Sequence, residues 1–221
     1  MGINFDFSDR TVFITGGAQG IGAALVETFH AAGAQVAAVD LETAAIEERW
    51  ADSERVLPLA CDVSDSAQCD NAIAATIDWS GAIDVLVNNA GITRDTVVWK
   101  LTDDAWSTVL DVHLTGTFNL TRAAIPHMRA QNRGRIVNVT SYTGLHGNIG
   151  QANYAAAKAG IIGFSKTVAK EVARFGITVN VVSPNAETPM VADIVGPREL
   201  HPGNRGSHDE LLGTSRRLNG G

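Results

Sequence analysis

A tyrosine, a lysine and a serine in the second half of the chain are of the types that carry out proton transfer. Tyr154 and Lys158 stand four residues apart in Asn153-Tyr-Ala-Ala-Ala-Lys158, so in a helix they share one face. A phenol with a pKa of about 10 is a poor base at neutral pH. A neighbouring ammonium group favours the phenolate, so we expect Lys158 to lower the pKa of Tyr154. The spacing alone is common, and a surface helix with an aromatic residue at its edge is the alternative interpretation.

Ser141 stands thirteen residues before Tyr154 and closes an expected strand. The carboxyl ends of parallel strands form the ligand crevice of such sheets. A serine there can hydrogen-bond a substrate carbonyl or hydroxyl, although serine more often serves in a turn or as a cap. Ser141, Tyr154 and Lys158 are therefore candidate catalytic residues, with the tyrosine as the candidate acid and base.

A glycine-rich segment near the N-terminus, Thr15-Gly-Gly-Ala-Gln-Gly-Ile-Gly22, follows an apolar strand and opens a helix. Its glycines permit a tight turn and close approach of the backbone to a pyrophosphate, and the helix N-terminus supplies N–H groups. An ordinary turn is the alternative, but the flanking strand and helix favour a dinucleotide site. The predicted contacts in this segment are Gly16, Gln19, Gly20, Ile21 and Gly22.

The second expected strand ends in Asp40, 18 residues after Gly22. A carboxylate at this position can accept both adenosine ribose hydroxyls and would repel a 2′-phosphate. No arginine or lysine stands in the glycine segment or immediately after Asp40 to offset that charge. A solvated aspartate at a strand end is the alternative. We predict that Asp40 and Leu41 contact the cofactor and that NAD(H) is preferred over NADP(H).

The elements that must position these residues alternate between short apolar strands and helical stretches, which indicates parallel βαβ units. The expected fold is α/β, with one doubly wound Rossmann-type domain over residues 1–194 and a parallel sheet of six strands. Residues 195–221 form an atypical tail with many glycines and four arginines, expected to be loose. The expected strands cover 11–15, 35–39, 55–60, 83–87, 135–140 and 177–182. The expected helices cover 21–32, 65–79, 102–130, bent or ended by Pro126, and 154–175.

Composition narrows the functional classes. The 221 residues fit one sizeable domain, and a net charge of −7 disfavours nucleic acid and anionic membranes as partners. The N-terminal residues lack the pattern of a secretory signal, and only two cysteines occur, so we expect a cytoplasmic protein. The six histidines are scattered, which predicts no metal site.

Together these residues resemble the short-chain dehydrogenase/reductase family over about residues 8–194. The matching motifs are Thr15-Gly16-x-x-x-Gly20-x-Gly22, Cys61-Asp-Val63, Asn88-Asn-Ala-Gly91, Ser141, Tyr154-x-x-x-Lys158 and Ser183-Pro184. The resemblance implies an NAD(P)-dependent oxidoreductase in which Ser141 orients the carbonyl, Tyr154 transfers the proton and Lys158 binds the ribose and acidifies Tyr154. It also implies cofactor contacts from Asp62, Val63, Asn89, Ala90, Gly91, Tyr154, Lys158 and Pro184.

Three positions depart from the family pattern. His113 stands where relatives usually carry an asparagine that helps hold a water in a proton relay. It either serves that relay or is a packed helix histidine. Pro184-Asn185 replaces the usual Pro-Gly, which puts in doubt the backbone contact to the nicotinamide amide near residues 186–188. The C-terminus does not match the substrate lid, helix and seventh strand of relatives, so we expect reduced stability or activity.

Residues 145–154 look most like the bacterial 3-oxoacyl-thioester reductases, which act on acyl carrier protein or coenzyme A substrates. Most of those that feed fatty-acid synthesis use NADPH, whereas Asp40 favours NAD(H). An NAD-linked 3-hydroxyacyl or other secondary-alcohol dehydrogenase is one alternative, and a catalytically impaired nucleotide-binding protein is another. The resemblance also implies a homodimer through helices 102–130 and 154–175, and it makes a tetramer doubtful because the C-terminal elements differ.

Overall fold

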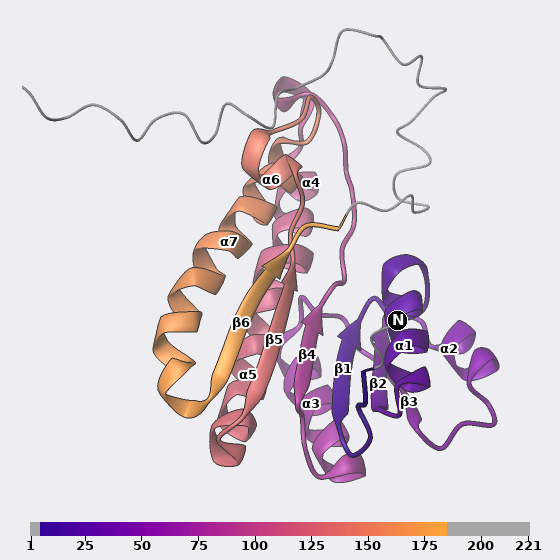
Figure 1. The fold of residues 1–221 in the computed structure, drawn as a ribbon. Coiled ribbons are helices and arrows are strands. Elements are labelled where there is room, and N and C mark those ends of the chain that lie inside the picture. The colour runs from indigo at the N-terminus through magenta and orange to yellow at the C-terminus, as the bar shows by residue number, and fades with distance from the viewer. Residues whose placement is uncertain (1–4, 185–221) are drawn as a thin grey trace, which may run out of the picture.

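The computed structural model describes residues 5–184, which form one parallel sheet with helices on its faces. The strand order is β3-β2-β1-β4-β5-β6, and every pairing is parallel. Figure 1 shows α7 alongside β6 at one edge of the sheet and α1 and α2 toward the other. The strands are β1 Thr11–Thr15, β2 Gln35–Asp40, β3 Val56–Ala60, β4 Val85–Asn88, β5 Gly134–Val139 and β6 Ile177–Val182.

The connections between consecutive strands carry the helices. They are α1 Gly20–Ala31, α2 Ala44–Arg49, α3 Ser66–Ser80, α4 Asp103–Leu110, α5 Gly116–Gln131, α6 Thr143–His146 and α7 Ala152–Val172. Three shorter segments complete the set: the 3₁₀ turns η1 Val98–Lys100 and η3 Ala173–Phe175, and the π-helical segment η2 Asp111–Thr115.

The strands alternate their side chains between two hydrophobic clusters, one on each face of the sheet. In β1, Phe13 packs into the cluster that α3, α5 and α7 cover, whereas Val12 and Ile14 pack into the cluster beneath α1 and α2. Burial on both faces explains why the strands are nearly continuous apolar runs. The predicted fold class, a doubly wound sheet of six parallel strands, is confirmed for the described residues.

Some predicted boundaries were wrong. Pro126 does not end the helix, because α5 continues through it to Gln131. The long helix predicted over 102–130 is instead divided into α4 and α5 by the π-helical segment η2. The short helices α2 and α6 were not predicted, since each spans too few residues to show a hydrophobic period. The predictions of a loose tail over 195–221, of the absence of a seventh strand and of an altered backbone contact near 186–188 all concern residues outside the described range.

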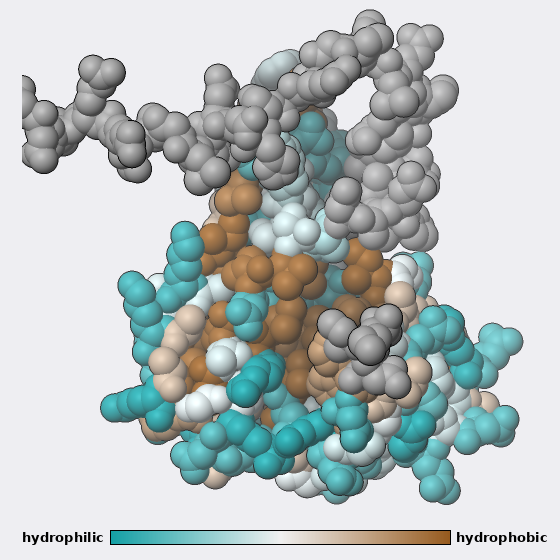
Figure 2. All heavy atoms as spheres, in the orientation of Figure 1, coloured by the Kyte–Doolittle hydropathy of each residue, from teal (hydrophilic) through white to brown (hydrophobic). Residues whose placement is uncertain are grey.

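One face of β5 and β6 has no described helix over it. Val137 and Val139 point to the face opposite α5 and α7, and Val182, which pairs with Val139, is 45 % exposed. Figure 2, drawn in the same orientation as Figure 1, shows hydrophobic residues gathered over the middle of this side of the molecule. In residues 5–184 no helix combines the length and the apolar character needed to cross a membrane.

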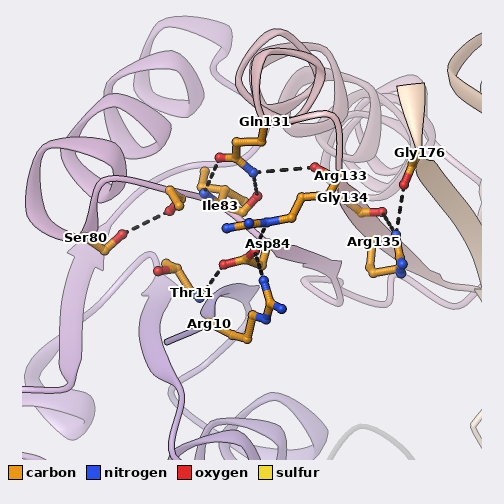
Figure 3. A network of polar contacts seen from close by, with 11 residues as sticks. Arg10, Thr11, Ser80, Ile83, Asp84, Gln131, Arg133, Gly134, Arg135 and Gly176 are labelled. Atoms are coloured by element: carbon orange, nitrogen blue, oxygen red, sulfur yellow. Dashed lines mark hydrogen bonds and ion pairs between the residues drawn. The ribbon is translucent and has the colours of Figure 1, made fainter. Parts of the chain in front are cut away.

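A buried carboxylate ties three strands together at the end of the sheet opposite the strand carboxyl termini. Oδ1 of Asp84 accepts hydrogen bonds from Arg133 Nε at 2.7 Å and Arg10 Nη1 at 3.2 Å, and Oδ2 accepts one from the Thr11 amide at 3.0 Å. Figure 3 shows both arginines converging on this carboxylate. The Asp84 side chain is only 6 % exposed, whereas the two arginine side chains are about half exposed, so the carboxylate end of each bond is shielded from water.

Asp84→Ala is expected to lower the free energy of unfolding by about 2–3 kcal/mol, because it leaves a buried amide without an acceptor and two arginines without their partner. Urea unfolding of both proteins measures the difference. The matched control is Glu27→Ala, which removes an ion pair to Arg49 in which both side chains are about half exposed. That pair is expected to contribute less than about 1 kcal/mol. Equal losses in the two variants would contradict this account.

Candidate active site

The glycine-rich segment connects β1 to α1 in a conformation that requires glycine. Gly16 and Gly20 have positive φ angles of 68° and 56°. A Cβ atom on Gly22 would lie 1.8 Å from the carbonyl oxygen of Gly16, so any side chain there would displace the turn. Gln19, the N-cap of α1, makes no side-chain capping bond. The first-turn N–H groups of α1 are therefore free to bind an anion, and the close backbone approach fits a pyrophosphate.

Asp40 lies beside this turn, at the end of β2. Its Oδ2 accepts a hydrogen bond from the Ala18 amide at 3.0 Å, and its Oδ1 accepts one from the Leu41 amide at 2.8 Å. The carboxylate thus stands next to the glycine turn, where the adenosine ribose of a dinucleotide would lie.

A cavity of about 390 Å³ opens along the carboxyl ends of the strands. Every predicted site residue except Gly22 lines it, so the structure brings the glycine turn, Asp40 and the catalytic candidates into one cleft. Gly22 instead packs behind Gly16. The cavity also has lining residues that were not among the predicted site residues, most of them at or just after strand ends. They are Val39, Cys61, Ile92, Val112, Val139 and Thr140.

The catalytic candidates come from two adjacent elements. Ser141 follows β5, and Tyr154 and Lys158 occupy the first two turns of α7. The Lys158 Nζ donates to the Val139 carbonyl at 2.7 Å and lies 5.6 Å from the centre of the Tyr154 ring. Thr140 Oγ1 donates to the Lys158 carbonyl at 2.9 Å, which fixes α7 against the end of β5.

The pKa values of Tyr154 and Lys158 are both shifted, that of Tyr154 in the direction opposite to the one that the sequence predicts. Burial raises the pKa of Tyr154; a hydrogen bond from Ser141 opposes that rise, and the negative charge of Asp95 adds to it. Burial also lowers the pKa of Lys158 to about 7. The pKa of Tyr154 is therefore raised, not lowered as predicted from its neighbour Lys158. Desolvation dominates, and the lysine is only 3 % exposed and directed at the Val139 carbonyl.

His113 lies in η2 and is 2 % exposed. Its Nε2 is 3.0 Å from the amide nitrogen and 2.8 Å from the carbonyl oxygen of Ile92, so the tautomer decides which of these bonds forms. Its Nδ1 has no hydrogen-bond partner among the described residues. The ring meets that of Tyr154 edge-on, with centroids 5.1 Å apart. His113 therefore joins the loop after β4 to η2, and its ring is in direct contact with the ring of Tyr154.

Burial and the charge of Lys158 lower the pKa of His113 to about 3, against 6.5 for an unperturbed histidine. Between these values the unfolded chain binds a proton that the folded chain does not, so this residue makes stability fall as pH falls. His113→Asn is expected to remove that contribution. Between pH 7.5 and pH 5 the wild type should lose about 2 kcal/mol more than the variant in urea unfolding. The control is His146→Asn at the exposed end of α6, and identical pH profiles for wild type and His113→Asn would contradict the assignment.

A parallel sheet in this strand order, with a glycine turn, a strand-end acid and a tyrosine–lysine pair on one cleft, defines a dinucleotide-binding oxidoreductase. Comparison with known proteins gives the family. The model of the short chain dehydrogenase family matches residues 10–198, and the chain belongs to that family. The predicted family and the predicted class, an NAD(P)-dependent oxidoreductase, are thereby confirmed.

Relatives of this chain include enzymes of two named kinds. It is 43 % identical over 186 residues to a 3-oxoacyl-(acyl-carrier-protein) reductase of Thermotoga maritima, covering 82 % of this chain and 76 % of that one. It is 41 % identical over 200 residues to a peroxisomal hydratase-dehydrogenase-epimerase of Neurospora crassa, covering 90 % of this chain but only 22 % of that protein. A solved short-chain dehydrogenase of Streptomyces avermitilis superposes with a TM-score of 0.77 at 34 % identity, covering 80 % of this chain and 65 % of that one.

Within the part of the chain that the structure describes, no group of three or more histidine, cysteine, aspartate or glutamate side chains could hold a metal ion. The residues that line the cleft and could carry the chemistry are Ser141, Tyr154 and Lys158, beside the proposed dinucleotide site.

Proposed function

We propose that this chain interconverts a 3-oxoacyl thioester and the corresponding 3-hydroxyacyl thioester with NAD(H). The observation that carries the proposal is the shared cleft, which places Ser141, Tyr154 and Lys158 beside the glycine turn and Asp40. The named 3-oxoacyl reductase among the relatives, and the likeness of residues 145–154 to such reductases, support the substrate class.

Each residue has a distinct task in this proposal. A nicotinamide dinucleotide held by the glycine turn and Asp40 would supply or accept the hydride. Ser141 donates a hydrogen bond to the substrate oxygen and so orients the carbonyl. Tyr154 donates its phenolic proton to that oxygen in reduction and accepts it in oxidation. Lys158 lines the same cleft, and its ammonium group, when protonated, would stabilise the phenolate that remains once the substrate oxygen has taken the proton.

The acid at the end of β2 supports the choice of NAD(H). Asp40 would accept the ribose hydroxyls and repel a 2′-phosphate, and its hydrogen bonds to Ala18 and Leu41 hold it at the cleft. The name of the Neurospora crassa relative, a hydratase-dehydrogenase-epimerase, favours a second candidate function. In it, the same site oxidises a hydroxyacyl thioester or another secondary alcohol.

Initial rates with acetoacetyl-coenzyme A and with 3-hydroxybutyryl-coenzyme A, each with both forms of the cofactor, test the proposal. We expect NADH oxidation with the first substrate and NAD⁺ reduction with the second. Turnover of simple secondary alcohols without turnover of either thioester would support a dehydrogenase of another substrate class. Tight NADH binding without turnover of any carbonyl compound would indicate a catalytically impaired protein.

We also propose a homodimer formed through α5 and α7. Phe118 of α5 is 40 % exposed and packs edge-on against Phe164 of α7, with ring centroids 6.3 Å apart. Arg122 lies over the Phe118 ring at 4.9 Å. Aromatic residues and arginine with this exposure are common at protein interfaces.

A further inference from the structure

Two loops from distant parts of the sequence lie side by side, and each is continuous with residues that line the cleft. The loop after β4 carries Asp95 and Thr96, and the loop before α7 carries Gly150 and Gln151. The Thr96 amide donates to the Gly150 carbonyl at 2.8 Å, and Thr96 and Gln151 form a short parallel bridge. The first loop begins with cleft-lining residues, and the second leads into the helix turn that carries Tyr154.

The side chain of Gln151 joins these loops. It is 5 % exposed, and its Nε2 donates to Asp95 Oδ2 at 2.8 Å. Its Oε1 accepts from Asn148 Nδ2 at 3.1 Å and from Thr143 Oγ1 at 3.3 Å. Because a carboxylate only accepts hydrogen bonds, the amide must face Asp95 with its nitrogen. Gln151 therefore contacts the loop after β4, α6 and its own loop at once.

Asn153, two residues after Gln151, makes a second connection to the segment after β4. It is fully buried, and its Nδ2 donates to the Arg94 carbonyl at 3.2 Å and to the Ala105 carbonyl at 3.0 Å. Its Oδ1 accepts from the Tyr154 amide at 2.8 Å. The backbone at Tyr154 is thus tied to the segment that contains Asp95, so a shift of that segment would move the tyrosine.

We propose that Gln151 and Asp95 are positioning residues for the reaction, and that their hydrogen bond sets the place of the Tyr154 hydroxyl over the cleft. This inference rests on the proposed function. Burial is the main cause of the raised pKa of Tyr154, and the negative charge of Asp95 adds to the rise, so the carboxylate lies within electrostatic reach of the hydroxyl. Among residues 5–184, the other polar or charged groups near Tyr154 include Lys158 and His113, with Ser141 as hydrogen-bond donor.

Exchanging the donor and the acceptor tests this bond. Gln151→Glu alone places two carboxylates against each other and is expected to lower kcat about tenfold to a hundredfold, because small displacements of reacting groups are costly. Asp95→Asn alone keeps an acceptor oxygen for Gln151 and should stay within about threefold of the wild type. In the double variant the introduced asparagine amide donates to the introduced glutamate carboxylate, which still accepts from Asn148 and Thr143. The double variant is expected to recover kcat to within about threefold of the wild type.

The matched control is Gln151→Glu combined with Asp104→Asn, an exposed position in α4 with the same change of residue type. It restores the net charge without restoring the bond, and we expect no recovery of kcat. The affinity for NADH, which depends on the glycine turn and Asp40, should be the same in all variants. A purely structural role predicts instead that kcat follows the thermal midpoint of each variant.

Amide hydrogen exchange of Thr96 and Ala155 gives a readout that needs no turnover, because both amides donate to the loop at residues 150–151. Exchange should speed up in Gln151→Glu and return to the wild-type rate in the double variant. If the wild type turns over no thioester, the proposed function fails, and the exchange pattern alone decides the positioning role. The inference is overturned if Gln151→Glu changes neither exchange nor kcat, or if the double variant recovers no more than the Asp104 control.

Discussion

Tyr154→Phe is expected to lower kcat by about a thousandfold, because it deletes the one hydroxyl placed to exchange a proton with the substrate oxygen. The phenyl ring keeps the edge-on contact with His113 and the neighbourhood of Lys158, so the fold of the cleft should survive. The affinity for NADH should change by less than about twofold, since the glycine turn and Asp40 are untouched. Steady-state kinetics with acetoacetyl-coenzyme A and fluorescence titration of NADH measure the two quantities.

The chain offers a matched control for this variant. Tyr142 is the only other tyrosine in the sequence, lies 67 % exposed in the turn before α6 and stacks on His146. Tyr142→Phe removes the same atom without touching the proposed proton path. A Tyr154→Phe enzyme that kept about a tenth or more of the wild-type kcat would exclude Tyr154 as the principal acid and base.

Asp40→Ser is expected to shift the cofactor preference, measured as the ratio of kcat/KM for NADH to that for NADPH, about a hundredfold toward NADPH. That change corresponds to about 2.7 kcal/mol, which comes from the lost ribose hydrogen bonds and from removing a negative charge near the 2′-phosphate. The hydroxyl of serine can still accept a bond from the Ala18 or Leu41 amide, so the strand end should keep its shape.

Glu42→Ser provides the comparison for Asp40→Ser, because it removes the same charge from an exposed position two residues along the chain. Its cofactor ratio should remain within about threefold of the wild type, as expected for an exposed charge screened by water. A wild-type enzyme that used NADPH as well as NADH would contradict the role assigned to Asp40.

The sequence predicted those features that depend on short segments. Apolar runs bounded by glycine and polar residues located all six strands, since burial on both faces leaves little room for polar side chains. Asp40 and Ser141 were predicted as site residues because ligands bind at the carboxyl ends of parallel strands, and both residues line the cleft.

The sequence could not predict features that depend on contacts between distant segments. Gln151 and Asp95 are 56 residues apart, and their pairing becomes visible only when the two loops lie together. The direction of the Lys158 side chain toward the Val139 carbonyl, and the dominance of burial over its charge at Tyr154, likewise depend on packing. No local sequence pattern predicts the π-helical segment at His113. This segment contacts the loop after β4 through the hydrogen bond between His113 and Ile92, which the sequence alone does not show.

Transfer of a labelled hydride tests the central claim most directly, namely that this cleft holds a dinucleotide against a carbonyl substrate. Acetoacetyl-coenzyme A would be incubated with NADH deuterated at C4 on either face of the nicotinamide, and the product analysed by mass spectrometry. We predict that deuterium from one face alone appears on the carbinol carbon of 3-hydroxybutyryl-coenzyme A. Saturating NADH binding with no labelled product from acetoacetyl-coenzyme A or from the wider carbonyl panel would contradict the account.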